Sequence, residues 1–204
     1  MGNLAGWLPL VATVIWVVAV LETTKFLDGL DGLAGGVGLA ASATLAILSL
    51  VLPGGNEPTA QLAAILAGAL GGFLFFNLPP ARAYLGEGGA AVIGFLLATL
   101  AIFTGGKVAT AFLVLGLPAA DAFRVVVSRL LKGRKPWQAG RDHLHHLLAD
   151  AGLGAKGAAL LLFLAAAALG AATFFLSIAG KIALAGILVV GIFPLAGWLE
   201  RRGR

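Results

Sequence analysis

Two aspartates that stand three residues apart lie between two long apolar runs of this sequence. Residues 23–36 read TTKFLDGLDGLAGG, so that Asp28 and Asp31 alternate with glycines. Residues three apart on a helical turn share a face, and two like charges so close repel unless a cation or a donor lies between them. Carboxylate oxygens suit Mg²⁺, which proteins commonly hold together with substrate phosphates. The alternative is a solvated loop with a helix cap, since Asp is a common capping residue.

A second cluster reads NLPPARAYLGEGGA over residues 77–90. Glu87 stands among glycines whose backbone N–H groups could form an anion-binding concavity, and Tyr84 offers a flat face to a base or a sugar. The alternative is a Pro- and Gly-rich turn in which Tyr84 belongs to the aromatic belt at a membrane interface.

A third cluster reads GRKPWQAGRDHLHH over residues 133–146 and contains all three histidines, His143, His145 and His146. Histidine can bind a metal, donate to phosphate oxygens or carry protons. Arg134 and Arg141 add fixed positive charge that suits a pyrophosphate. A tetrahedral zinc site is disfavoured because the chain has no cysteine, so phosphate contact is the preferred interpretation. The alternative is that the basic residues only orient the chain and touch lipid headgroups.

The composition identifies the elements that must position these clusters. Of the 204 residues, 60% are hydrophobic and only 11% are charged, whereas soluble domains are nearer half apolar and a quarter charged. The chain is therefore an integral membrane protein, and its 30 glycines indicate close helix contacts. The net charge of +5 does not indicate nucleic acid, because the basic residues cluster beside apolar runs.

The apolar runs predict an all-α, polytopic membrane helix bundle with about seven transmembrane helices, which forms a single domain over residues 1–204. The predicted spans are Gly6–Leu21, Gly36–Leu52, Ala60–Phe76, Ala90–Phe103, Val108–Leu131, Gly157–Ala179 and Ile182–Leu199. Asp121 and Arg124 fall within the fifth span, where the preferred interpretation is a structural ion pair; a transport path lined by Asp121 is the alternative.

Seven spans put alternate connections on the same side of the membrane. All but two of the 14 Lys and Arg residues, Lys107 and Lys181, then share one side, which the bias assigns to the cytoplasm. Residues 22–35, 77–90 and 131–156 all fall on that side. The topology therefore predicts one polar site at the cytoplasmic face of the cell inner membrane.

Four motifs, in order, resemble those of the polyprenyl-phosphate N-acetylhexosamine-1-phosphate transferases. LDGLDGLA at residues 27–34 resembles the family's Asp-Gly-x-Asp-Gly segment, and residues 77–87 resemble its next cytoplasmic motif. Residues 118–134 resemble a third block. HLHH at residues 143–146 is similar to the His-x-His-His form of the N-acetylglucosamine branch. The chain resembles the C-terminal two-thirds of that family.

The resemblance implies transfer of a sugar-1-phosphate from a UDP-sugar to polyprenyl phosphate at the cytoplasmic face, with Mg²⁺ and release of UMP. It also implies roles for the residues of the motifs. The catalytic set is Asp28, Asp31, His143, His145 and His146; the substrate-binding set is Asn77, Tyr84, Gly86, Arg134 and Arg141; and the metal ligand is Glu87.

The sequence departs from the family pattern at several of these positions. Glu22 and Lys25 stand where the family commonly has Asn, Glu87 replaces a metal-binding Asp, and Gly140 replaces another Asp. The family's Asp-Asp pair, which lies in an earlier loop, has no counterpart here. The chain is then a fragment, half of a split enzyme or a degenerate relative, with a homodimer or a complementing N-terminal chain as the expected partner.

Three functions follow from these observations. The first is a Mg²⁺-dependent glycosyl-1-phosphate transferase that uses a UDP-sugar, with N-acetylglucosamine as the expected sugar. The second is a non-catalytic subunit that binds a nucleotide sugar or a lipid phosphate and needs a partner chain. The third is a transporter, in which Asp121 would line the path.

Overall fold

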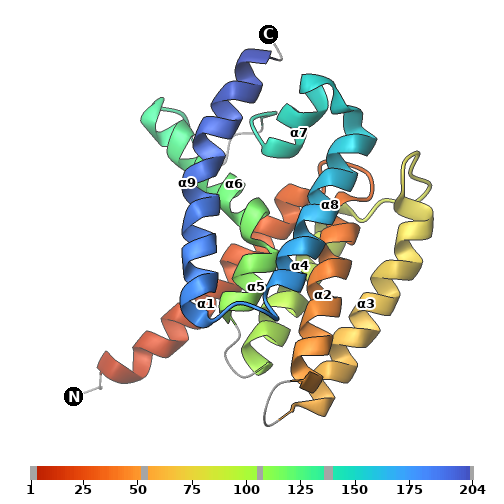
Figure 1. The fold of residues 1–204 in the computed structure, drawn as a ribbon, viewed down its shortest axis with the longest axis vertical. Coiled ribbons are helices and arrows are strands. Elements are labelled where there is room, and N and C mark those ends of the chain that lie inside the picture. The colour runs from red at the N-terminus through yellow and green to blue at the C-terminus, as the bar shows by residue number, and fades with distance from the viewer. Residues whose placement is uncertain (1–3, 52–54, 105–107, 136–139, 203–204) are drawn as a thin grey trace.

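The computed structural model describes residues 4–51, 55–104, 108–135 and 140–202, and all the regular elements of these residues are helical (Figure 1). Leu52 and Lys107, and residues 136–139 of the third cluster, lie outside the described residues. The elements are α1 (Leu4–Leu27), α2 (Leu33–Val51), α3 (Glu57–Asn77), α4 (Gly86–Phe103), α5 (Val108–Val114), α6 (Gly116–Leu131), α7 (Leu144–Leu148), the π-helical turn η1 (Ala149–Leu153), α8 (Gly154–Ala172) and α9 (Ile178–Arg202).

Six helical stretches of the described residues are long and apolar enough to cross a membrane. They are Gly6–Leu27, Leu33–Val51, Glu57–Asn77, Gly86–Phe103, Leu144–Ala172 and Ile178–Arg202. Many of their large apolar side chains are exposed, as the lipid-facing surface of a membrane bundle requires. The prediction of an all-α polytopic membrane protein is confirmed.

The predicted fifth span is formed by two consecutive helices, α5 and α6, which meet at Leu115. Pro118 lies in the first turn of α6. Proline has no backbone N–H and cannot bond to the carbonyl four residues earlier, here that of Val114, so an unbroken helix is disfavoured at this point. Together α5 and α6 still run from one end of the bundle to the other (Figure 1). The chain therefore makes this pass as a broken helix.

Helix α2 lies at the centre of the bundle and packs against α3, α4 and α8. Its inward side chains Leu33, Val37 and Leu45 are almost completely buried. Glycines allow close approach between helices: an added Cβ at Gly94 of α4 would lie 2.7 Å from the Cα of Leu21 in α1. The expectation that glycine marks close helix contacts is confirmed at this crossing.

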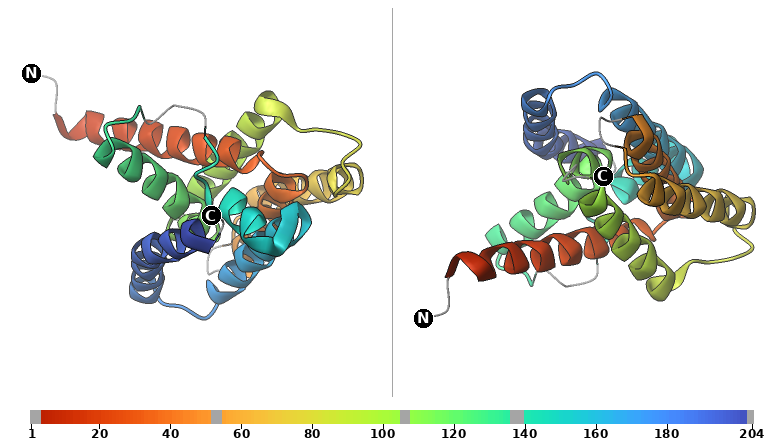
Figure 2. Two further views of the ribbon diagram at one scale, coloured as in Figure 1. Left: turned by 90° about the horizontal axis from the view of Figure 1, so that it is seen from above. Right: turned by 90° about the horizontal axis from the view of Figure 1, so that it is seen from below.

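The polar segments that connect the helices gather at one end of the bundle. Residues 28–32, residues 78–85, α7 and the C-terminal end of α9 lie at this end, whereas the N-terminal end of α1 and residues 173–177 lie at the other (Figure 1). Viewed along the bundle, the C-terminal ends of α3 and α6 stand on opposite sides of this polar end (Figure 2). Three segments that are distant in the sequence are thus brought to the same end, as the topology predicted.

Candidate functional site

The loop that follows α1, residues 28–32, presents the two predicted aspartates at the polar end. It turns sharply. The N–H of Asp28 donates to the carbonyl of Lys25 (3.2 Å), and the N–H of Leu33 donates to the carbonyl of Leu30 (3.1 Å). Gly32 has φ = 79°, a conformation that side chains other than glycine's rarely adopt. Asp28 and Asp31 are both partly exposed in this loop. We call residues 28–32 the acidic loop.

Asn77, at the end of α3, ties the acidic loop to the 77–87 segment. Its Oδ1 accepts a hydrogen bond from the N–H of Gly32 (2.9 Å), and its Nδ2 donates to the carbonyl of Ala83 (2.9 Å). The side chain is buried, and these two bonds use both ends of the amide. Asn77 therefore fixes the relative position of the two segments, and its predicted contact with a substrate stays a prediction.

Both aspartates also contact the 77–87 segment. Asp31 accepts a hydrogen bond from the N–H of Ala81 (3.1 Å) through Oδ2, and Asp28 accepts one from the N–H of Gly86, the first residue of α4. Partial burial raises the pKa of Asp28 above its usual value, and the bond from Gly86 opposes that rise. Each carboxylate keeps free oxygen lone pairs that can accept further donors.

Glu87, the predicted metal ligand, is paired with a cation of the chain itself. Its Oε1 lies 2.8 Å from Nζ of Lys25, which also contacts Glu22 at 3.2 Å. Tyr84 lies on the same side of the site with 75% of its surface exposed, so its ring is free to stack on a ligand. Among the described residues, no three His, Asp or Glu side chains are arranged to hold a metal ion.

His143 is held by a carboxylate from the interior of the bundle. Its Nδ1 lies 3.0 Å from Oδ2 of Asp121, and the same oxygen accepts the N–H of Leu144 (2.9 Å). The ring stacks between Phe26, at 5.0 Å, and His145, at 5.6 Å. These contacts fix the orientation of the imidazole and connect the histidine segment to the end of α1.

The other oxygen of Asp121 binds Arg124, as the structural interpretation of that pair expected. Arg124 donates to Oδ1 through Nε (3.1 Å) and a terminal nitrogen (2.9 Å), and it also bonds to the carbonyl of Asp142. Both side chains are almost fully buried. Since both oxygens of Asp121 are engaged within the protein, the residue does not line an open transport path.

His145 makes the link between the histidine segment and the acidic loop. An added Cβ at Gly29 would lie only 2.6 Å from Nε2 of His145, so the imidazole stands directly against the loop backbone. His146 is adjacent, with ring centroids 4.2 Å apart, and its buried Nδ1 has no hydrogen-bond partner in the part of the chain that is described. A polar ligand at the acidic loop would find both rings beside it.

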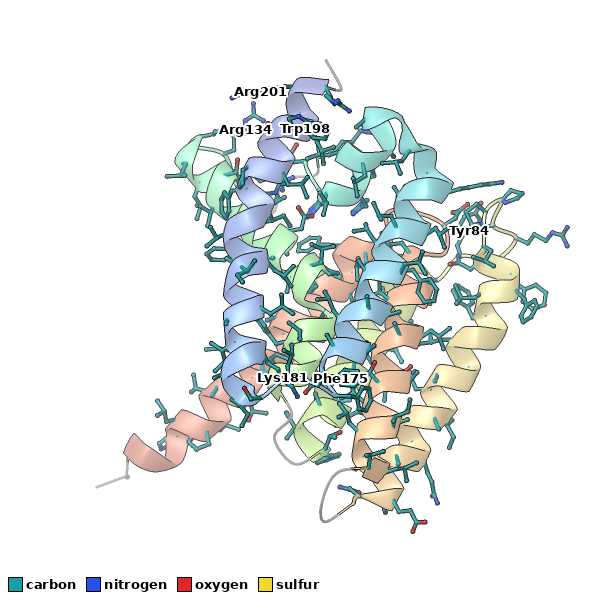
Figure 3. The ribbon with its side chains drawn as sticks, viewed as in Figure 1. Tyr84, Arg134, Phe175, Lys181, Trp198 and Arg201 are labelled. Atoms are coloured by element: carbon teal, nitrogen blue, oxygen red, sulfur yellow. The ribbon has the colours of Figure 1, made fainter. Side chains whose placement is uncertain are left out.

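Arg134 and Arg141 lie elsewhere on the polar end. They line a cavity of about 280 Å³ between α6, α9 and residues 141–150. Figure 3 places Arg134 and Tyr84 on opposite sides of the polar end. The ends of α6 and α3, which precede them in the chain, also lie on opposite sides in Figure 2. The structure thus brings together Asp28, Asp31, Asn77, Gly86 and His145, and it leaves Arg134 on the opposite side of the polar end from Tyr84.

Sequence reasoning missed two contacts that shape this site. The first is the bond between Asp121 and His143, which are 22 residues apart and give no local signal. The second is the ion pair between Lys25 and Glu87. The i,i+3 spacing of Glu22 and Lys25 could have indicated that Lys25 has acidic neighbours.

Fold and site define a multi-pass membrane protein with acidic, amide and imidazole groups converging at one end. The model of glycosyl transferase family 4 matches residues 1–105, just over half of the 204 residues. The chain therefore belongs to glycosyl transferase family 4.

Curated relatives have names that agree with this family. The chain is similar to a "Probable undecaprenyl-phosphate N-acetylglucosaminyl 1-phosphate transferase" of Bacillus subtilis (29% identity, 78% of this chain and 46% of the relative). It is also similar to a decaprenyl-phosphate N-acetylglucosaminephosphotransferase of Mycolicibacterium smegmatis (30% identity, 74% of this chain and 43% of the relative). A phospho-N-acetylmuramoyl-pentapeptide-transferase of Shouchella clausii is 32% identical over 70% of this chain and 44% of the relative. The chain spans about half the length of these relatives.

Proposed function

We propose that this chain takes part in the transfer of a sugar-1-phosphate, with N-acetylglucosamine as the sugar, from a UDP-sugar to polyprenyl phosphate at the cytoplasmic face of the inner membrane. One observation supports this above the others: the acidic loop, the 77–87 segment and His145 meet at one end of the bundle through the Gly32–Asn77, Asp28–Gly86 and Gly29–His145 contacts. The names of the family relatives supply the reaction class.

The proposed reaction is a phosphoryl transfer. An oxygen of the lipid phosphate bonds to the phosphorus that carries the sugar, the pyrophosphate bond breaks, and UMP leaves with the bonding electron pair. Catalysis of this kind depends mainly on positioning and charge stabilisation. His145 and His146 would donate to phosphate oxygens, Asp28 and Asp31 would accept from hydroxyl or amide groups of the donor, and Tyr84 would stack on its base.

The residues of this chain do not by themselves fit a magnesium site. Lys25 lies 2.8 Å from the carboxylate of Glu87, and Asp28 and Asp31 each bind a backbone N–H of the 77–87 segment. Mg²⁺ enters our proposal as a cofactor held by substrate phosphates together with carboxylates of a complementing N-terminal chain or of a second copy of this chain.

A second candidate function is a non-catalytic subunit that binds a UDP-sugar or a lipid phosphate. The Lys25–Glu87 ion pair favours it, because an ammonium group occupies the carboxylate to which the family resemblance assigns the metal. The two candidate functions use the same site. They differ in that the transferase releases UMP, whereas the subunit only binds its ligand.

One experiment separates the two functions. The purified chain in lipid nanodiscs is given UDP-N-acetylglucosamine and undecaprenyl phosphate, with and without Mg²⁺, and both UMP release and binding of the UDP-sugar are measured. UMP release supports the transferase, and binding without release supports the subunit. If the UDP-sugar does not bind, the transferase and a subunit that binds the UDP-sugar are both rejected. Glu57→Gln serves as a control in the same assay. Glu57 is an exposed acid at the start of α3, at the opposite end of the bundle, so its loss should change neither UDP-sugar binding nor UMP release.

A further inference from the structure

A basic cavity separate from the acidic loop lies where the C-terminal ends of α6 and α9 meet residues 141–150. It measures about 280 Å³, and none of Asp28, Asp31, Asn77 or His145 lines it. The transfer reaction proposed above gives it no role. Its charged lining residues are Arg129, Lys132, Arg134, Arg141, Asp142, Asp150 and Glu200.

The end of α6 builds one wall of this cavity through its backbone. Gly133 adopts φ = 67°. Its N–H donates to the carbonyl of Leu130 (3.0 Å), and the N–H of Arg134 donates to the carbonyl of Arg129 (2.8 Å). This is the Schellman arrangement, in which glycine in the left-handed region reverses the chain after the last helical turn. The reversal carries Arg134 back over the helix end, so that it lines the cavity together with Lys132.

Two of the three acids of the cavity pair with an arginine that lines it: Asp142 with Arg129 (3.0 Å) and Asp150 with Arg141 (2.9 Å). Glu200 lies 3.8 Å from Arg124, which also binds Asp121. Lys132 and Arg134 form no ion pair with any carboxylate of the described ranges. They leave a local surplus of positive charge that faces the cavity, beside the hydroxyl of Ser128.

The chain beside the cavity is apolar and suited to the membrane interface. Leu131, next to Lys132, is 83% exposed, and Trp198, next to the lining residue Leu199, is 50% exposed with the Arg202 guanidinium 4.2 Å from its ring. Arg134 lines the cavity together with Leu199, and Figure 3 shows Arg134 and Trp198 at the same end of the bundle. Tryptophan and arginine at a helix end are typical of the headgroup level, and basic pockets between spanning helices recognise anionic headgroups.

We infer that the α6–α9 cavity binds the phosphate of an anionic membrane lipid. The Lys132 ammonium and the Arg134 guanidinium offer donors to the phosphate oxygens, Ser128 offers a hydroxyl, and the acyl chains would follow the apolar surface beside Leu131 and Trp198. This site does not depend on the sugar-phosphate transfer proposed above, because it uses none of the residues of the acidic loop.

The test measures which lipids stay bound to the purified full chain. The chain is reconstituted in nanodiscs of equal parts phosphatidylglycerol and phosphatidylcholine, extracted in mild detergent, and its bound lipids are quantified by native mass spectrometry. We expect phosphatidylglycerol to be enriched over phosphatidylcholine among the bound lipids. Lys132→Gln and Arg134→Gln should each lower that enrichment about fivefold, because one basic residue near an anionic surface usually contributes that much. Arg134→Lys, which keeps the charge, should retain most of the phosphatidylglycerol enrichment of the wild type.

Two controls make the result specific. Lys156→Gln removes an exposed charge from the start of α8, outside the cavity, and should leave the enrichment unchanged. Gly140→Asp should lower the enrichment, because an added Cβ there would lie 2.8 Å from the Arg129 guanidinium and 3.3 Å from the Asp142 carboxylate, so that it would displace the ion pair that lines the cavity. Equal loss in Lys156→Gln, no preference for phosphatidylglycerol, or complete displacement of the lipid by inorganic phosphate would each overturn the inference.

Discussion

The acidic loop and the Asp121 network are both built on aspartate, yet they use it in opposite ways. Asp121 is almost fully buried, and its two oxygens meet Arg124, His143 and a backbone N–H. Asp28 and Asp31 are partly exposed and each accept from a backbone N–H of the 77–87 segment. A carboxylate whose oxygens are all engaged holds the fold together. A carboxylate with free lone pairs at the surface is available to a ligand.

The largest expected effect comes from breaking the Asp121 network. Asp121→Asn leaves a buried guanidinium without its carboxylate, which typically costs about 3–5 kcal/mol. We expect a large fall in the unfolding temperature of the detergent-solubilised chain, together with loss of UDP-sugar binding, because His143 loses its anchor. Asp31→Asn is the control and should unfold within a few degrees of the wild type. Equal unfolding temperatures for Asp121→Asn and wild type would contradict the assigned role.

Asn77→Ala tests whether the amide links the two segments. It removes the bonds to Gly32 and Ala83 and leaves buried polar groups unpaired, at a cost of about 1–3 kcal/mol. We expect weaker UDP-sugar binding, measured by isothermal titration calorimetry, together with lower stability.

Asn56→Ala is a matched control for that substitution. Asn56 also makes two hydrogen bonds, to Phe103 and from Thr59, but at the other end of the bundle. It should lower stability without changing the affinity for the UDP-sugar. If both variants lose affinity equally, Asn77 acts on stability alone.

Asp28→Asn should separate ligand binding from stability. The pKa of Asp28 is raised in the folded state, so its ionised form is disfavoured by folding once the pH rises above the unfolded value. The Asn variant should therefore be at least as stable as the wild type at pH 7, and the difference should vanish below about pH 4, where both states carry the protonated acid. UDP-sugar binding at pH 7 should nevertheless weaken, by roughly tenfold or more, through loss of a charge-assisted hydrogen bond. Thermal unfolding across this pH range and a binding titration measure the two effects.

Glu87→Gln should have the smallest effect on stability. Glu87 is mostly exposed, and an exposed ion pair contributes little to stability because water screens the two charges. Because Lys25 occupies the carboxylate, we expect Glu87→Gln to leave UMP release, its Mg²⁺ requirement and the unfolding temperature near those of the wild type. Loss of Mg²⁺-dependent UMP release at an unchanged unfolding temperature would instead place Glu87 in the metal site.

Much of the architecture could be predicted from the sequence because the membrane imposes it. A long apolar run must form a helix to satisfy its backbone in lipid, and the number of such runs fixes on which side each connection lies. That is why the acidic loop, residues 78–85 and α7 could be expected at the same end. The break of the fifth span at Leu115 was not predicted, although Pro118 gave the signal.

The sequence by itself determined the membrane class, the helix order and the polar character of one end. Only the tertiary structure decided which polar groups meet there. It bound Asn77 between two loops, paired Glu87 with Lys25, and separated Arg134 from Tyr84 across the polar end. The physical reason is range: apolar burial and backbone satisfaction act along each segment, whereas a hydrogen bond or an ion pair depends on the lateral packing and rotation of helices that are distant in the chain.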